Sequence, residues 1–70
     1  MSYEELKETD MYKQAEEVVI CVNGDDIEFT ENELYKYGNI DVCFVIGTGH
    51  IGKKLLVDLL VPEQMLCKLF

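Results

Sequence analysis

The segment Val18 to Val22 contains three valines, an isoleucine and a cysteine, and it ends at Asn23 and Gly24. β-Branched side chains favour strands, and Asn-Gly is the dipeptide that best tolerates the positive φ angles of a tight hairpin turn. Asp26 to Thr30 then alternates acidic and apolar side chains, as a half-buried returning strand does. The sequence therefore predicts a β-hairpin in its first half.

Helix-start patterns flank this hairpin. Ser2 is followed three residues later by Glu5, and Thr30 is followed in the same way by Glu33. In such pairs each side chain satisfies a free backbone amide of the other residue at a helix start. We expect two helices, one from Ser2 to about Glu17 and a short one from about Glu31 to Tyr37.

The second half begins with an unbroken apolar run, Asp41 to Ile46, which is typical of a strand covered on both faces. We predict that it is the central strand. A helix is expected after Gly47 to Gly52, because one set of side chains is apolar at helical spacing (Ile51, Leu55, Leu56, Leu59 and Leu60) while Lys53, Lys54 and Asp58 face the other way. The alternative is that Leu55 to Val61 is a strand that pairs back on Val42 to Ile46.

Pro62 stops that element or opens a last short helix, in which Met65, Leu66 and Leu69 are three or four residues apart. Seventy residues leave room for one core, so residues 1–70 are expected to form a single small domain. The predicted fold class is α+β: an N-terminal helix, a hairpin plus one central strand in a three-stranded sheet, and short C-terminal helices.

Charge divides the chain in two. Six lysines against fourteen acidic residues give a net charge of −8, and arginine is absent. Residues 1–33 hold eleven acidic residues and two lysines, whereas residues 34–70 hold three acidic residues and four lysines. Phosphate recognition favours arginine, so direct nucleic-acid binding is not expected, whereas a concentrated negative field attracts basic protein surfaces. The simpler interpretation is that the charge only keeps a small domain soluble.

The leading functional hypothesis is therefore a small acidic binding module or inhibitor that docks on a basic, nucleic-acid-binding surface of a partner protein. Anti-CRISPR proteins and other small acidic phage inhibitors of bacterial defence act in this way as a class, and the analogy is one of size and charge. Tyrosines are enriched at interface hot spots, so they join the acids. The candidate partner-binding residues are Glu16, Glu17, Asp25, Asp26, Glu28, Glu31, Glu33, Tyr35 and Tyr37.

The stretch Asp41 to Gly52 has glycines at 47, 49 and 52 directly after the apolar run. It resembles the fingerprint of Rossmann dinucleotide-binding domains, in which the strand delivers a glycine loop and a helix amino terminus faces the phosphates. That resemblance implies Gly47, Gly49 and Gly52 as cofactor-binding residues in an alternative, nucleotide- or phosphate-binding function. The family's acidic residue about twenty positions further on has no counterpart here.

Other chemistry is not indicated. Cys21, Cys43 and Cys67 lie in apolar runs without a CxxC pair, which favours free buried thiols over a disulfide framework or a zinc site. His50 is the only histidine. We expect no enzyme activity, cofactor, metal or membrane span, and a cytoplasmic location, that of a host cell if the source is viral. A homodimer and a structural subunit of an assembly remain open alternatives.

Overall fold

The predicted hairpin is present in the computed structural model, which describes residues 1–65. Strand β1 (Glu17–Val22) ends at Asn23 and Gly24, whose φ angles are both positive, 51° and 75°. The chain returns as β2 (Glu28–Thr30), which pairs antiparallel with β1 and places Glu28 opposite Cys21. The Asn-Gly turn and the hairpin are therefore confirmed, with a returning strand that begins two residues later than expected.

Both helix-start patterns form capping boxes. Ser2 and Glu5 cap α1 (Tyr3–Lys7), and Thr30 and Glu33 cap α3 (Glu31–Tyr35). The single helix predicted from Ser2 to about Glu17 is wrong, because the chain is extended at Thr9 and begins a second helix, α2 (Asp10–Gln14). The Thr9 hydroxyl donates to the Leu6 carbonyl and accepts from the Tyr12 amide. A threonine that competes with the backbone in this way ends one helix and caps the next.

The second half corrects the main fold prediction. After a short 3₁₀ turn, η1 (Ile40–Val42), the chain forms β3 (Phe44–Ile51), turns at Gly52 and returns as β4 (Lys54–Leu60). The helix predicted from Ile51 to Leu60 is wrong, and the alternative of a strand that pairs back is correct. The helix prediction failed because Leu55 to Leu60 contains a single charged residue. Its apolar pattern therefore fits the period of a helix as well as that of a strand.

The sheet has four strands in the order β2-β1-β4-β3 rather than three. β4 lies between β1, to which it is parallel, and β3, to which it is antiparallel. The predicted central strand is instead split between η1 and the start of edge strand β3, and Val42, Phe44 and Ile46 are exposed. Gly47 and Gly49 weaken β3, since glycine adds no packing to a strand, and an edge position tolerates that loss best.

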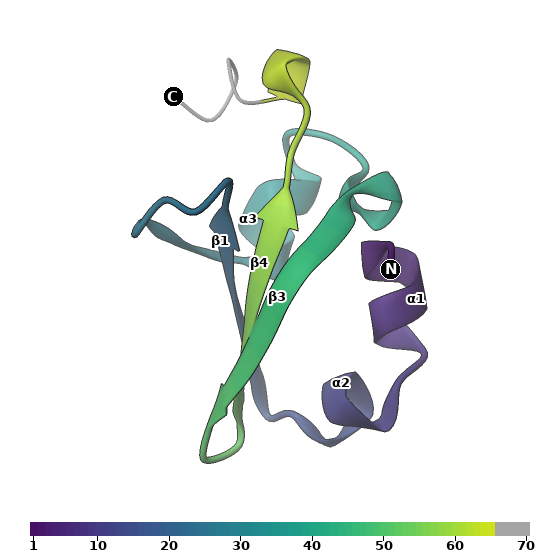
Figure 1. The fold of residues 1–70 in the computed structure, drawn as a ribbon, viewed down its shortest axis with the longest axis vertical. Helices are drawn as coiled ribbons and strands as arrows, with labels where there is room; N and C mark the ends of the chain where they lie inside the picture. The colour runs from purple at the N-terminus through teal and green to yellow at the C-terminus, as the bar shows by residue number, and fades with distance from the viewer. Residues whose placement is uncertain (66–70) are drawn as a thin grey trace.

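All described helices pack on one face of the sheet, and Figure 1 shows α1 and α2 together on that side. The core between them is apolar and closely packed; its fully buried side chains are Tyr3, Leu6, Ile20, Val22, Leu34, Ile40, Leu55 and Leu59. The opposite face of the sheet carries no described helix. We call it the open face. Strand register places on it Glu17, Val19 and Cys21 of β1, Glu28 and Thr30 of β2, Lys54, Leu56, Asp58 and Leu60 of β4, and Phe44, Gly47, Gly49 and Ile51 of β3.

The end of the described chain closes the core. The Met65 amide donates to the Pro62 carbonyl, and the buried Met65 side chain contacts Gly38, where an added Cβ would lie 2.9 Å from Met65 Cε. A helical turn therefore does follow Pro62. The part of the predicted last helix that contains Leu66 and Leu69 lies outside the described residues.

Substitution of two neighbouring leucines tests the strand in β4. A helix would place Leu59 and Leu60 on the same apolar face, whereas the strand buries Leu59 completely and leaves Leu60 52% exposed. Leu59→Ala should cost about 2–5 kcal/mol of unfolding free energy, which a domain of this size barely tolerates, whereas Leu60→Ala should cost under about 1 kcal/mol. Urea unfolding followed by circular dichroism measures both. Equal losses would contradict the strand.

Candidate partner-binding surface

One end of the open face carries four carboxylates. Asp25 and Asp26 belong to the β1–β2 turn, Glu28 begins β2 opposite Cys21, and Asp58 lies beside them on β4. We call these four residues the acidic cluster. Burial raises the pKa of the Cys21 thiol, and all four carboxylates raise it further. They therefore act on one point of the open face even though they come from separate parts of the chain.

The turn that bears the acidic cluster is held in place by its own polar groups. Asp25 accepts a hydrogen bond from the Ile27 amide at 3.2 Å, and Asp58 accepts one from the Gly24 amide at 3.3 Å. The Asn23 side chain bonds both backbone groups of Val61, accepting from its amide at 2.7 Å and donating to its carbonyl at 3.3 Å. Because three segments are tied together, the carboxylates are presented on a fixed backbone.

A shallow hollow of about 370 Å³ adjoins the cluster on the open face. Cys21 and Leu56 line it together with Gly47 and Gly49, which contribute no side chains. An added Cβ at Gly49 would meet nothing within 4 Å, and one at Gly47 would meet only Asp58 Cβ at 3.9 Å. The glycines therefore open the surface without any close backbone approach that requires them.

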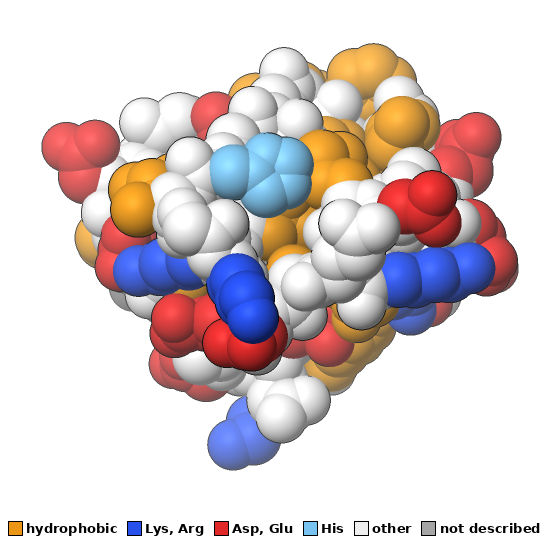
Figure 2. Space-filling view, turned by 90° about the horizontal axis from the view of Figure 1, so that it is seen from below, with side chains coloured by type: hydrophobic (Ala, Val, Ile, Leu, Met, Phe, Trp, Pro, Cys, Tyr) orange, Lys and Arg blue, Asp and Glu red, His pale blue; other side chains and the backbone are white. Residues whose placement is uncertain are grey.

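The structure brings together only part of the predicted partner-binding set. Asp25, Asp26 and Glu28 lie close together, but Glu16 and Glu17 are at the other end of β1. There Glu16 forms an ion pair with Lys53 at 3.1 Å, and Glu17 lies opposite Lys54 in the sheet register. Figure 2 shows the end of the molecule where β3 turns into β4, with acidic and basic side chains interspersed around the histidine. This end is not a uniform negative surface.

Glu31 and Tyr35 lie on the helical side and serve the fold. Glu31 Oε2 accepts hydrogen bonds from the hydroxyls of both Tyr3 and Tyr12. Tyr35 donates to Asp41 and accepts from Lys7, which also pairs with Asp41 at 2.9 Å. These contacts join α1 and α2 to α3 and η1. Of the other predicted residues, Glu33 caps α3 and Tyr37 is exposed.

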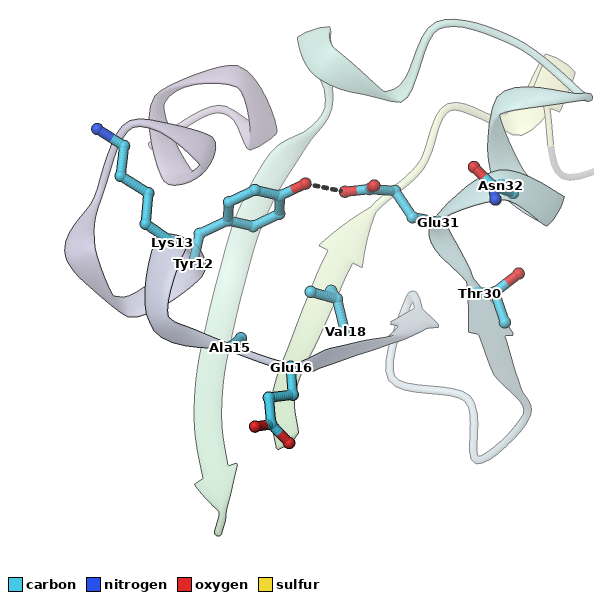
Figure 3. A pocket seen from close by; sticks show the side chains of 8 residues that line it. All are labelled: Tyr12, Lys13, Ala15, Glu16, Val18, Thr30, Glu31 and Asn32. Atoms are coloured by element: carbon cyan, nitrogen blue, oxygen red, sulfur yellow. Dashed lines mark hydrogen bonds between the residues drawn. The ribbon is translucent and has the colours of Figure 1, made fainter. Parts of the chain in front are cut away.

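A second hollow, of about 410 Å³, lies where α2, β1 and α3 meet (Figure 3). The Tyr12–Glu31 hydrogen bond spans it, Val18 rises from β1, and the Thr30 and Asn32 side chains extend from the far side. Burial and the bond to Glu31 raise the pKa of Tyr12 to about 12 and also raise that of Tyr3. Both phenols therefore stay protonated and donate to Glu31. These two hydrogen bonds connect α1 and α2 to α3.

The Rossmann-like glycine pattern does not form the arrangement that it implies. Gly47 and Gly49 lie within β3, and Gly52, with a φ of 61°, makes the turn into β4. The motif is therefore followed directly by a strand, β4, and not by a helix, so among the described residues no helix amino terminus follows the glycines as the fingerprint requires. Sequence reasoning missed Asp58 and the glycine hollow as parts of the site, because both depend on β4 being a strand beside β1.

Removing the Glu31 carboxylate tests its role in holding the helices together. Glu31→Ala leaves two largely covered phenols without their acceptor and should cost about 1–3 kcal/mol of unfolding free energy. Asn32→Ala changes a neighbouring side chain of the same helix and the same hollow, and should cost under about 0.5 kcal/mol. Urea unfolding measures both. Identical midpoints would show that the two tyrosine bonds contribute nothing.

Within residues 1–65, no helix is long and apolar enough to cross a membrane, and no group of histidine, cysteine and acidic side chains is arranged to hold a metal ion. Comparison with protein families, with curated proteins and with solved structures finds nothing that this chain matches, so its own geometry is the basis for assigning a function.

Proposed function

We propose that this chain is a protein-binding module that docks its acidic cluster and the adjoining hollow on a basic surface of a partner protein, and that it is not an enzyme. The observation that carries the proposal is the convergence of Asp25, Asp26, Glu28 and Asp58 at one end of a sheet face that no described helix covers. Four carboxylates on a tied backbone, beside an apolar hollow, suit cationic side chains.

The charges of the cluster are available for a partner. The ion pairs in the described residues are Lys7–Asp41 and Lys53–Glu16, and neither involves the acidic cluster. Every lysine that pairs thus does so elsewhere in the described chain. The whole chain has a net charge of −8, and these four carboxylates concentrate negative charge at one end. This local field steers a positive surface toward that end.

The hollow beside the acidic cluster can receive the apolar stem of a basic side chain. Lysine and arginine lay an apolar stem along a surface and place the charged head in a polar environment. Here a stem can lie over Leu56 and the two glycines, while the head reaches Asp25 or Asp58. Burying such a charge is favourable only when carboxylates satisfy it, and the cluster supplies them.

A clustered basic patch is the electrostatic footprint of a protein that binds nucleic acids. A small acidic chain that occupies such a surface blocks it, which makes an inhibitor the favoured form of this proposal. An inhibitor of host defence encoded by a virus, acting in the host cytoplasm, fits the size and charge of this chain.

A matched pair of charge reversals tests the proposal. Asp26→Lys with Glu28→Lys reverses two cluster charges that make no described side-chain bond, and Glu4→Lys with Glu8→Lys makes the same change in net charge on the helical side. Each chain is immobilised and exposed to lysate of the native host, and a protein retained by the wild type is purified. Its dissociation constant should rise at least about tenfold for the cluster variant and under about threefold for the helix variant.

Salt provides the second measurement on that purified protein. Because the proposed contact is between exposed charges, binding should weaken steeply as the ionic strength rises. The protein should also lose its own nucleic-acid binding when the chain is present. Equal affinity for the two variants, or binding that is insensitive to salt, would contradict docking through the acidic cluster.

A further inference from the structure

Strand β3 has an outer edge that only its first residues share with another segment. The Val45 amide donates to the Met1 carbonyl at 2.7 Å, and the Tyr3 amide donates to the Cys43 carbonyl at 2.9 Å. From Ile46 to the turn at Gly52, no described segment pairs with the outer side of β3. We call Ile46–Gly52 the free edge. Its backbone groups form a template for another strand.

Natural edges are usually protected by charged residues, proline or a covering segment. A β-bulge at Ile46 begins the free edge, and from Gly47 to Ile51 the register is continuous. Over that stretch no segment within residues 1–65 covers the edge; residues 42–57 contain no acidic residue and no proline, and the nearest lysines lie at the turn. Two large apolar side chains on it, Ile46 and Ile51, are exposed, Ile51 by 66%. An unprotected apolar edge on an otherwise acidic molecule indicates a surface that is covered in use.

The free edge is complementary to itself. Gly49 is its midpoint, so an antiparallel copy centred there places Gly47 opposite Ile51 of the second copy and Thr48 opposite His50 of the second copy. Gly47, Gly49 and Ile51 share the open face; nothing lies within 4 Å of an added Cβ at Gly49, and only Asp58 Cβ, at 3.9 Å, at Gly47. Each copy therefore fills the other's hollow with an isoleucine, which is the reciprocal contact of a two-fold interface.

The charge distribution also favours a second copy of this chain as the partner of the free edge. Two chains that each carry −8 repel each other over most of their surfaces, and residues 42–57 form the longest stretch without a carboxylate. Basic proteins, by contrast, are attracted to the acidic cluster, which lies on the same face at the β1–β2 turn.

We infer that two copies of this chain pair through their free edges and form one continuous eight-stranded sheet. The open faces then lie on the same side, and the two β1 strands are five strand spacings apart, about 24 Å. The dimer presents an acidic cluster on each wing, so one assembly can grip two basic sites. The pairing does not rest on the proposed function, because it is made by the backbone edge of β3, whereas docking is made by the four carboxylates. The two surfaces meet at the hollow over Gly47 and Gly49, which Ile51 of the second copy covers in the dimer, so docking on the dimer relies on the carboxylates.

Light scattering coupled to size-exclusion chromatography tests the pairing. The wild type should elute at twice its mass of 8.1 kDa. Ile51→Glu places a carboxylate on the free edge and should elute as a monomer at the same concentration. Ile27→Glu makes the same change at an exposed site in the β1–β2 turn and should remain a dimer. Circular dichroism verifies that both variants are folded.

A second variant tests the register. Gly47→Val fills the hollow that receives Ile51 of the second copy, while its Cβ meets only Asp58 Cβ at an ordinary distance within its own chain. The dimer dissociation constant should rise at least about tenfold. Higher salt should leave the wild-type dimer intact, because it screens the repulsion between copies.

Three results would overturn the pairing: a wild type that is monomeric from micromolar to millimolar concentration, equal effects of the two glutamate variants, or a Gly47→Val dimer as tight as the wild type. None of them bears on docking through the acidic cluster, which is measured with a purified partner and responds to salt in the opposite direction.

Discussion

The structure depends on the position of β4 in the middle of the sheet. Alternate side chains of this strand, Leu55, Val57 and Leu59, are buried in the core, and its backbone pairs with β1 on one side and β3 on the other. A chain of seventy residues has one core, and β4 supplies three of its buried side chains. The same placement brings Asp58 beside the hairpin turn and moves β3 to the edge.

The acidic residues divide into two groups with different physical roles. Glu5 and Glu33 complete capping boxes, Glu31 accepts hydrogen bonds from two tyrosines, and Asp41 pairs with Lys7 and accepts a hydrogen bond from Tyr35. These carboxylates hold short helices on a small sheet, and their hydrogen-bonding partners lie within the fold. Asp26 and Glu28 take part in no described side-chain bond, and they lie with Asp25 and Asp58 on the open face. Net charge alone does not separate the two groups; their positions in the fold do.

Local signals predicted the first half of the fold well. A β-branched run, an Asn-Gly turn and two Ser/Thr–Glu pairs act over a few residues, so the hairpin and both capping boxes are where the sequence places them. The second half depends on which apolar segment pairs with which, and the apolar spacing favours a helix where the chain in fact forms β4. The site shows the same division: Asp25, Asp26 and Glu28 follow from the turn, whereas Asp58 and the glycine hollow follow only from the pairing of β1 with β4.

The central claim is that the acidic cluster and the hollow beside it form the contact surface. Amide hydrogen exchange of the complex between this chain and the protein that it retains tests this most directly, because it reports contact without any substitution. Exchange should slow at residues 21–28 and around Asp58, while the amides of α1 and α2 should be unchanged. Slower exchange on α1 and α2, with the hairpin turn unaffected, would contradict the account.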